Sequence, residues 1–167
     1  ICYLSASEAL EKFKNKSLSP VELLNETIKR IENVNPKINA FNFFRFEEAL
    51  KEAKKSELKY TEDKSTLPLE GLPLAIKDEV NVKGHPNKNG SLIYKDTIAE
   101  GTDVDVESLV SSGAIIHART TNPEFSLTSF CHSKVNGVTR NPWNLDMTPG
   151  GSSGGSAAAL ASGCASL

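Results

Sequence analysis

The second half of the chain alternates between strand-like and helical patterns, and this alternation limits the fold more than any other feature. It gives a buried strand, a helix, a second strand and a helix of small residues, at 72–82, 104–112, 114–118 and 153–162. Strands that alternate with helices predict an α/β fold, in which a largely parallel mixed sheet is covered by helices.

The first 60 residues are predicted to be mainly helical. Two Ser-x-x-Glu capping boxes, at 5–8 and 19–22, mark the starts of two helices. Pro36 is predicted to end the second helix, because proline lacks the backbone N–H that the helix needs. We therefore expect, in chain order, helix 5–15, helix 20–35, strand 38–44 and helix 46–59.

The chain is predicted to be part of one domain with three segments. These are a helical segment at 1–60, a polar connection at 61–71 and an α/β core at 72–167. Because the chain starts at Ile1 and stops inside a patterned stretch, we expect it to be an incomplete part of its fold.

Composition excludes several classes of partner. A net charge of −2 over 167 residues provides no basic surface for nucleic acid. No apolar run approaches the roughly 20 residues that span a membrane. The three cysteines follow no disulfide or zinc spacing, which favours a reducing, cytoplasmic location and no bound metal. We expect no cofactor.

The stretch TPGGSSGGSAAALASG, at 148–163, is the first candidate for a functional loop. A phosphate loop needs a lysine after its last glycine, but Gly155 is followed by Ser156. Gly150–Gly154 matches the nucleophile elbow G-x-S-x-G, yet no acid or histidine follows it in the chain, as that triad requires. The simplest interpretation is a glycine turn that leads into a helix, with Ser152 or Ser153 as its cap.

Lys77 gives this loop a second interpretation. It lies near the end of an apolar strand, so the base of its side chain is expected to be buried. Burial disfavours the charged form of an amine, and a buried lysine can therefore act as a neutral proton acceptor. Lysine also activates serine in some hydrolases, so Lys77 and Ser152 form the most economical acid–base pair in the chain.

Four stretches together resemble the amidase signature family, in its order and spacing: GLPLAIKD (71–78), SSGAIIHARTTNPEF (111–125), TRNPW (139–143) and TPGGSSGG (148–155). The resemblance covers residues 5–167 and implies the amidase-signature fold with a Ser–cisSer–Lys triad. It implies that Lys77 is the general base, and that Ser152, after a cis peptide bond, relays protons. Gly150, Gly151, Ser153, Gly154 and Gly155 would support the loop.

The resemblance also implies that part of the site lies outside this chain. In the family the nucleophilic serine and the oxyanion hole come from a second glycine-serine element, downstream of the helix that begins near Ser153. The chain ends at Leu167, before such an element. By itself it is therefore expected to be inactive.

Other residues give weaker signals. Asn122, Glu124 and Phe125 match a family segment beside the acyl pocket, so Ser126 is a weak candidate for the substrate site; a packed loop explains them equally well. Cys131 and His132 would point to opposite faces of a strand, which argues against a catalytic pair. Residues 140–143 are expected to anchor the loop into Gly150.

Three functions remain open. The first is an amidohydrolase that cleaves a carboxamide C–N bond of a small molecule through an acyl-serine. The second is the glutaminase subunit of a tRNA-dependent amidotransferase, which shares the triad. The third is a truncated, non-catalytic module. The phenylalanines at 41–46 serve either a homodimer contact or the core.

Overall fold

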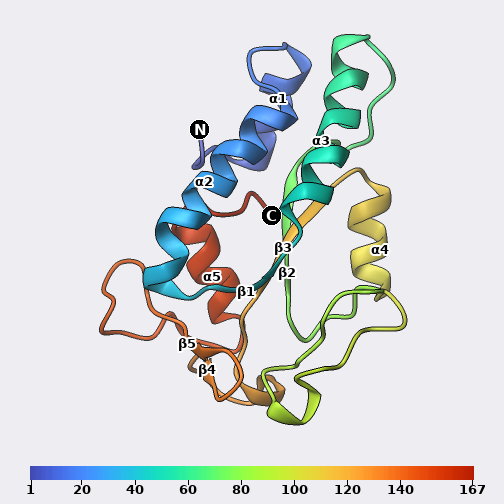
Figure 1. Cartoon of the computed structure of the whole chain (residues 1–167). Coiled ribbons are helices and arrows are strands. Elements are labelled where there is room, and N and C mark those ends of the chain that lie inside the picture. Colours follow the sequence, from blue (N-terminus) through green and yellow to red (C-terminus); the bar gives the residue numbers. More distant parts are fainter.

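A three-stranded sheet lies at the centre of the structure, with helices on both sides of it (Figure 1). This computed structural model describes all 167 residues. In chain order the elements are α1 (Ala6–Lys14), α2 (Pro20–Ile38), β1 (Phe41–Phe44), α3 (Phe46–Thr61), β2 (Pro73–Lys77), the 3-10 turn η1 (Leu92–Tyr94), α4 (Val104–Ser111), β3 (Ile115–Thr120), the 3-10 turn η2 (Glu124–Ser126), β4 (His132–Ser133), β5 (Gly137–Val138) and α5 (Gly154–Ala161).

The central strand of the sheet is β3. It pairs in parallel with β2 and antiparallel with β1, and all its residues are buried. The register places Lys77, the last residue of β2, beside Thr120, the last residue of β3. The backbone of Leu167 bonds to the other edge of β2, at Pro73 and Ala75. The predicted α/β fold with a mixed sheet and helical covering is confirmed.

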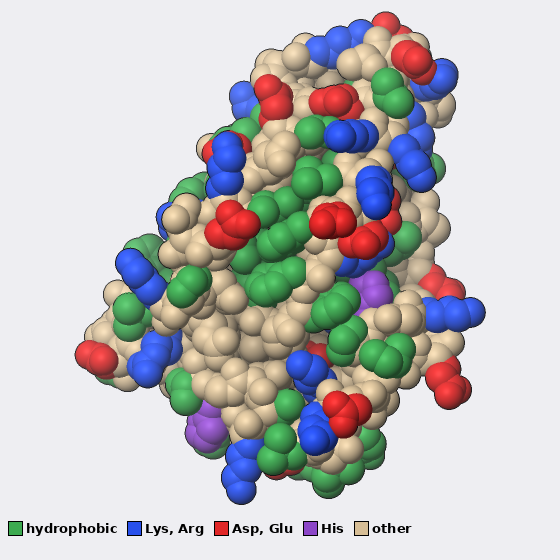
Figure 2. All heavy atoms as spheres, in the orientation of Figure 1, with side chains coloured by type: hydrophobic (Ala, Val, Ile, Leu, Met, Phe, Trp, Pro, Cys, Tyr) green, Lys and Arg blue, Asp and Glu red, His purple; other side chains and the backbone are tan.

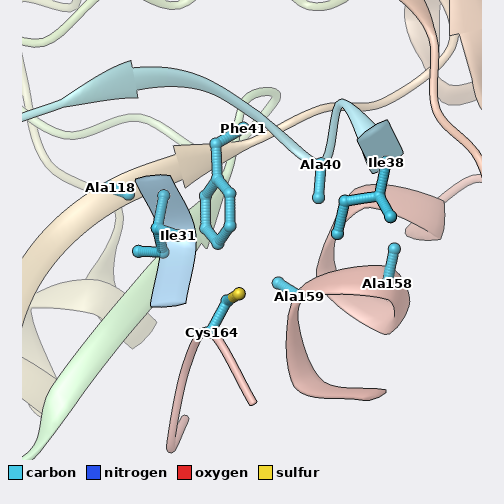
Figure 3. Packing of buried hydrophobic residues seen from close by; sticks show 8 residues of the cluster. All are labelled: Ile31, Ile38, Ala40, Phe41, Ala118, Ala158, Ala159 and Cys164. Carbon is cyan, nitrogen blue, oxygen red and sulfur yellow. The ribbon is translucent and has the colours of Figure 1, made fainter. Parts of the chain in front are cut away.

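Helix α5 packs against the sheet through small side chains. Ala158 and Ala159 belong to one apolar cluster with Phe41 of β1 and Ala118 of β3. Figure 3 shows the Phe41 ring pointing into the space between Ile31 of α2 and Ala159. Because alanines need little room, this part of α5 lies close to the sheet.

Apolar side chains also fill the seam between α2 and α3. Leu24 and Ile28 of α2 cluster with Ala49 and Ala53 of α3. Figure 2 shows hydrophobic side chains gathered between these helices, with charged side chains around them. None of the helices combines the length and the apolar composition needed to cross a membrane.

The phenylalanines at 41–46 occupy different environments. Phe41 is buried in the core, whereas Phe44 is 40% exposed and packs against Phe46, with ring centroids 4.9 Å apart. Core packing therefore accounts for Phe41. A homodimer contact at Phe44 remains a prediction.

Helix α2 continues through Pro36, so the predicted end at this residue was wrong. Pro36 has no N–H to donate to the Glu32 carbonyl, four residues earlier in the helix. Both residues are exposed, so water can bond to that carbonyl instead. Ile31 and Ile38 are buried and hold the last turns against the core. The helix ends at Asn39, which has left-handed backbone angles.

Three strands differ from their predicted ranges. β1 begins later than 38 because α2 is longer than expected, and β3 extends two residues beyond the predicted 118. β2 ends at Lys77 rather than 82, because the chain turns there and the Val80 N–H donates to the Lys77 carbonyl at 3.1 Å. The hairpin of β4 and β5 was not predicted, since strands of two residues show no alternation.

The cap of α2 allows a first test of the local structure. Ser19 accepts a hydrogen bond from the Glu22 N–H at 3.1 Å, and the Glu22 side chain bonds back to the Ser19 N–H at 2.8 Å. Ser19→Ala should lower the free energy of unfolding by about 1 kcal/mol. Denaturant titration measures this loss. Ser17→Ala is the matched control, because the exposed Ser17 side chain caps no helix; equal effects of the two variants would contradict the capping role.

Candidate active site

The end of β2 brings Lys77 to the glycine-serine loop. Lys77 Nζ donates to Ser152 Oγ at 2.9 Å. The Lys77 side chain is 12% exposed, and Ser152 is partly buried. The structure therefore brings together the two residues singled out in the sequence, at a separation suited to direct proton transfer.

The loop before α5 turns sharply at Ser152. Gly150 has a φ of +86°, which favours glycine, and the Gly151–Ser152 peptide bond is cis. A Cβ at Gly151 would lie 2.8 Å from the Thr128 carbonyl oxygen and from the Phe130 nitrogen. The loop thus lies directly on the 128–130 backbone, where no larger residue fits at Gly151.

The next two glycines let the start of α5 come close to Cys131 and to Thr121, which directly follows β3. A Cβ at Gly154 would meet the Cys131 Cβ at 2.4 Å, and a Cβ at Gly155 would meet the Thr121 carbonyl oxygen at 2.4 Å. The Gly155 N–H donates to that same oxygen at 3.2 Å. The glycines therefore permit a backbone contact that fixes the start of α5, and with it Ser152, relative to β3.

Ser153 occupies the N-cap position of α5, as predicted, but its exposed side chain accepts no capping hydrogen bond. The Ser152 hydroxyl is directed to Lys77 instead. The first turn of α5 is held by Ser156, whose hydroxyl lies 2.7 Å from that of Thr120 in β3. The two adjacent serines thus have different environments.

Arg119 supports the turn after β2 and was missed in the sequence. Its side chain is fully buried, and its guanidinium donates to the carbonyls of Lys77, Asp78 and Val80, at 3.0 Å and 3.2 Å for the first two. Burial lowers the pKa of Arg119 to about 10, against the opposing effect of nearby carboxylates, so it stays cationic at neutral pH. The only signal in the sequence was a charged residue directly after the strand predicted at 114–118.

Glu79 also contacts the site and was not predicted to do so. Its Oε1 lies 2.7 Å from Lys77 Nζ, and Ser126 lies beside its carboxylate. Ser126 in turn accepts from the buried Asn122 amide at 2.9 Å. Burial opposes ionisation of Glu79, but the nearby Lys77 amine and Ser126 hydroxyl outweigh it and lower the pKa of this carboxyl. Ser126, predicted to line the substrate site, thus lies beside the carboxylate that contacts Lys77.

The remaining candidates lie around this centre. Glu124 is exposed and accepts from the Ser91 hydroxyl at 2.7 Å. Cys131 is buried, whereas His132 is exposed and stacks on Phe130 with ring centroids 4.5 Å apart. Cys131 and His132 therefore differ in environment, and the structure shows no hydrogen bond between their side chains.

Residues 140–143 make unequal contributions to the loop that follows. The Asn141 N–H donates to the Met147 carbonyl at 3.0 Å, and Arg140 donates to the Leu145 carbonyl at 2.9 Å. Trp143, by contrast, is 84% exposed. Hydrogen bonds from Arg140 and Asn141 therefore hold the segment that leads to Gly150, whereas the indole of Trp143 is exposed to solvent.

Comparison with known proteins identifies the class that this fold and site define. Residues 22–167 match the family model Amidase. The chain is 40% identical over 158 residues to a glutamyl-tRNA(Gln) amidotransferase subunit from Methylacidiphilum infernorum, covering 95% of this chain and 31% of that protein. It is 36% identical over 163 residues to the indoleacetamide hydrolase of Bradyrhizobium diazoefficiens, covering 98% and 31%.

Solved structures agree with this result. A bacterial aryl acylamidase of the amidase signature family superposes with a TM-score of 0.92 at 30% identity, covering 98% of this chain and 34% of that one. A 6-aminohexanoate cyclic dimer hydrolase superposes with a TM-score of 0.87 at 32% identity, covering 98% and 33%. The chain belongs to the amidase signature family. It spans about a third of the length of the relatives it matches.

Proposed function

We propose that this chain is part of an amidohydrolase that cleaves a carboxamide C–N bond through an acyl-serine intermediate. The observation that carries the proposal is the 2.9 Å contact between Lys77 Nζ and Ser152 Oγ. Family membership supports the same reaction class, because the relatives include hydrolases of amides. The nucleophilic serine and the oxyanion hole are assigned to residues outside the 167.

In the proposed reaction a neutral Lys77 accepts the proton of Ser152, while the Ser152 oxygen accepts the proton of the nucleophilic serine. The nucleophile's oxygen bonds to the amide carbon. The C–N bond then breaks, and the leaving nitrogen receives a proton from Ser152, which regains one from Lys77. Water attacks the acyl-serine through the same relay, releasing the acid and restoring the serine.

The relay is tested by comparing the two adjacent serines in the full-length protein. Ser152→Ala removes the proton relay and should lower kcat for amide hydrolysis by about 10²–10⁴-fold. Ser153→Ala is the matched control, because this exposed side chain makes no capping bond. It should change kcat less than about threefold. Full activity of Ser152→Ala, or equal losses in both variants, would rule out the relay.

A second candidate is the glutaminase subunit of a tRNA-dependent amidotransferase. The 40% identity to a subunit of a glutamyl-tRNA(Gln) amidotransferase favours it. This function predicts that the full-length protein co-purifies with partner subunits and hydrolyses glutamine only in their presence. Amide hydrolysis by the isolated protein would instead favour the amidohydrolase.

The third candidate, a non-catalytic module, is distinguished by a fluorophosphonate probe for reactive serines. The amidohydrolase predicts labelling of the full-length protein at a serine beyond Leu167, whereas the module predicts no label. We further propose a small-molecule amide substrate and no cofactor. A cytoplasmic location is supported by the three unpaired cysteines, which fit a reducing compartment.

A further inference from the structure

Lys77 is held from two sides. One is Ser152 Oγ, 2.9 Å from its Nζ, and the other is Glu79 Oε1, at 2.7 Å. The turn that ends β2 makes the second contact possible. The Val80 N–H donates to the Lys77 carbonyl, and Arg119 donates to the same carbonyl. These bonds shape the turn so that the Glu79 carboxylate lies next to the Lys77 amine.

Glu79 is itself held in place. Ser126 lies beside its carboxylate and helps to lower the pKa of this group. Because Ser126 Oγ accepts from Asn122 Nδ2, its own proton is available to Glu79. The backbone around Ser126 is constrained: Phe125 and Ser126 have φ of 52° and 55°, and the Phe125 N–H donates to the Asn89 carbonyl at 2.9 Å. The order of contacts is therefore Asn122, Ser126, Glu79, Lys77 and Ser152.

The other charged groups around this turn bond elsewhere. They are Asp78, which accepts from the Lys88 and Gly90 N–H groups; Arg119, which donates to backbone carbonyls; Asp103, which accepts from Asn81; and Glu124, which accepts from Ser91. Glu79 is thus the carboxylate in direct contact with the Lys77 amine.

We propose that Glu79, with Ser126 beside its carboxylate, is a positioning residue that aims Lys77 at Ser152. The inference rests on the proposed function of Lys77 as a base. The 2.7 Å contact with the carboxylate restricts a flexible side chain to one orientation, and misplacement of a catalytic group lowers the rate.

This role differs from a structural one in what it predicts. Glu79 is 34% exposed, and an ion pair with a partner this accessible contributes little to stability. Loss of Glu79 should therefore change catalysis while leaving the thermal unfolding temperature nearly unchanged. A purely structural role would instead lower the unfolding temperature together with the activity.

The test compares kcat and KM of the full-length Glu79→Gln and Glu79→Ala variants. Glutamine keeps an oxygen that can accept from Lys77, so kcat should stay near the wild-type value. Alanine removes the orienting contact, so kcat should fall about tenfold or more, with KM unchanged.

Two further variants complete the design. Glu52→Gln is the matched control, because Glu52 also forms an ion pair, with Arg45 at 2.9 Å, but on α3; its kcat should match that of the wild type. Ser126→Ala keeps the charge of Glu79 but loosens it, so kcat should fall with KM unchanged. A rise in KM alone would place Ser126 at the substrate and contradict its proposed role.

The outcomes separate this inference from the proposed function. If Lys77→Ala and Ser152→Ala abolish hydrolysis but Glu79→Ala keeps the wild-type kcat, only the positioning role is overturned. If Lys77→Ala retains full activity, the base assignment fails and the role of Glu79 fails with it.

Discussion

Replacing Lys77 with alanine in the full-length protein is expected to lower kcat for amide hydrolysis about 10³-fold, within the range of a lost general base. The reason is that Ser152 Oγ, 2.9 Å from Lys77 Nζ, loses its proton acceptor. Steady-state kinetics at the pH optimum measures the loss. Lys83→Ala is the matched control because its side chain is exposed, and it should retain wild-type kcat.

A double variant tests whether Lys77 and Ser152 act together. If Lys77 and Ser152 act as one relay, Lys77→Ala combined with Ser152→Ala should be about as slow as either single variant, because residues that act as a unit are not additive. Multiplicative losses would show that the two residues act independently. Intact hydrolysis by Lys77→Ala would remove the lysine from the mechanism altogether.

Replacing Gly155 with alanine is expected to destabilise the fold. The new Cβ would lie 2.4–2.5 Å from the nitrogen, the carbonyl oxygen and the hydroxyl of Thr121, so the start of α5 must move away from β3. Helix propensity favours alanine over glycine by about 1 kcal/mol. Overpacking against the backbone costs about 3 kcal/mol. The free energy of unfolding should therefore fall by about 2 kcal/mol.

The same substitution should also reduce activity, because the displaced start of α5 carries Ser152 away from Lys77. Denaturant titration measures the first effect and steady-state kinetics the second. Gly101→Ala is the matched control: no atom lies within 4 Å of its added Cβ, and its φ is not positive. A Gly155→Ala variant as stable and active as Gly101→Ala would show that the close approach to Thr121 has no consequence.

Much of the fold was predictable because its signals are local. Ser5 and Ser19 mark the starts of α1 and α2, where both predicted capping boxes form. The predicted helix starts near 46, 104 and 153 lie within one residue of those observed. Caps and apolar spacing report hydrogen bonds and burial within one segment, so they can be interpreted without knowing what packs against it.

The errors arose where distant segments decide the structure. Pro36 predicts a helix end, but burial of Ile31 and Ile38 against β1 and α5 outweighs the loss of one exposed hydrogen bond. The end of β2 was misplaced because Arg119, from another strand, bonds to the carbonyls that follow Lys77. Nothing within the affected segments indicates these contacts.

The candidate site also combines residues that local patterns predict with residues that only contacts between distant segments reveal. The residue types and motif spacing determined that Lys77 and Ser152 belong together, because an apolar strand ending in lysine and a glycine-rich turn are both visible along the chain. Only the tertiary structure added Glu79 and Arg119 to their surroundings and placed Ser126, a weak sequence candidate, beside Glu79. Their contacts depend on how the turn after β2 packs against β3 and the 122–126 segment, and packing between distant segments leaves no periodic pattern in a sequence.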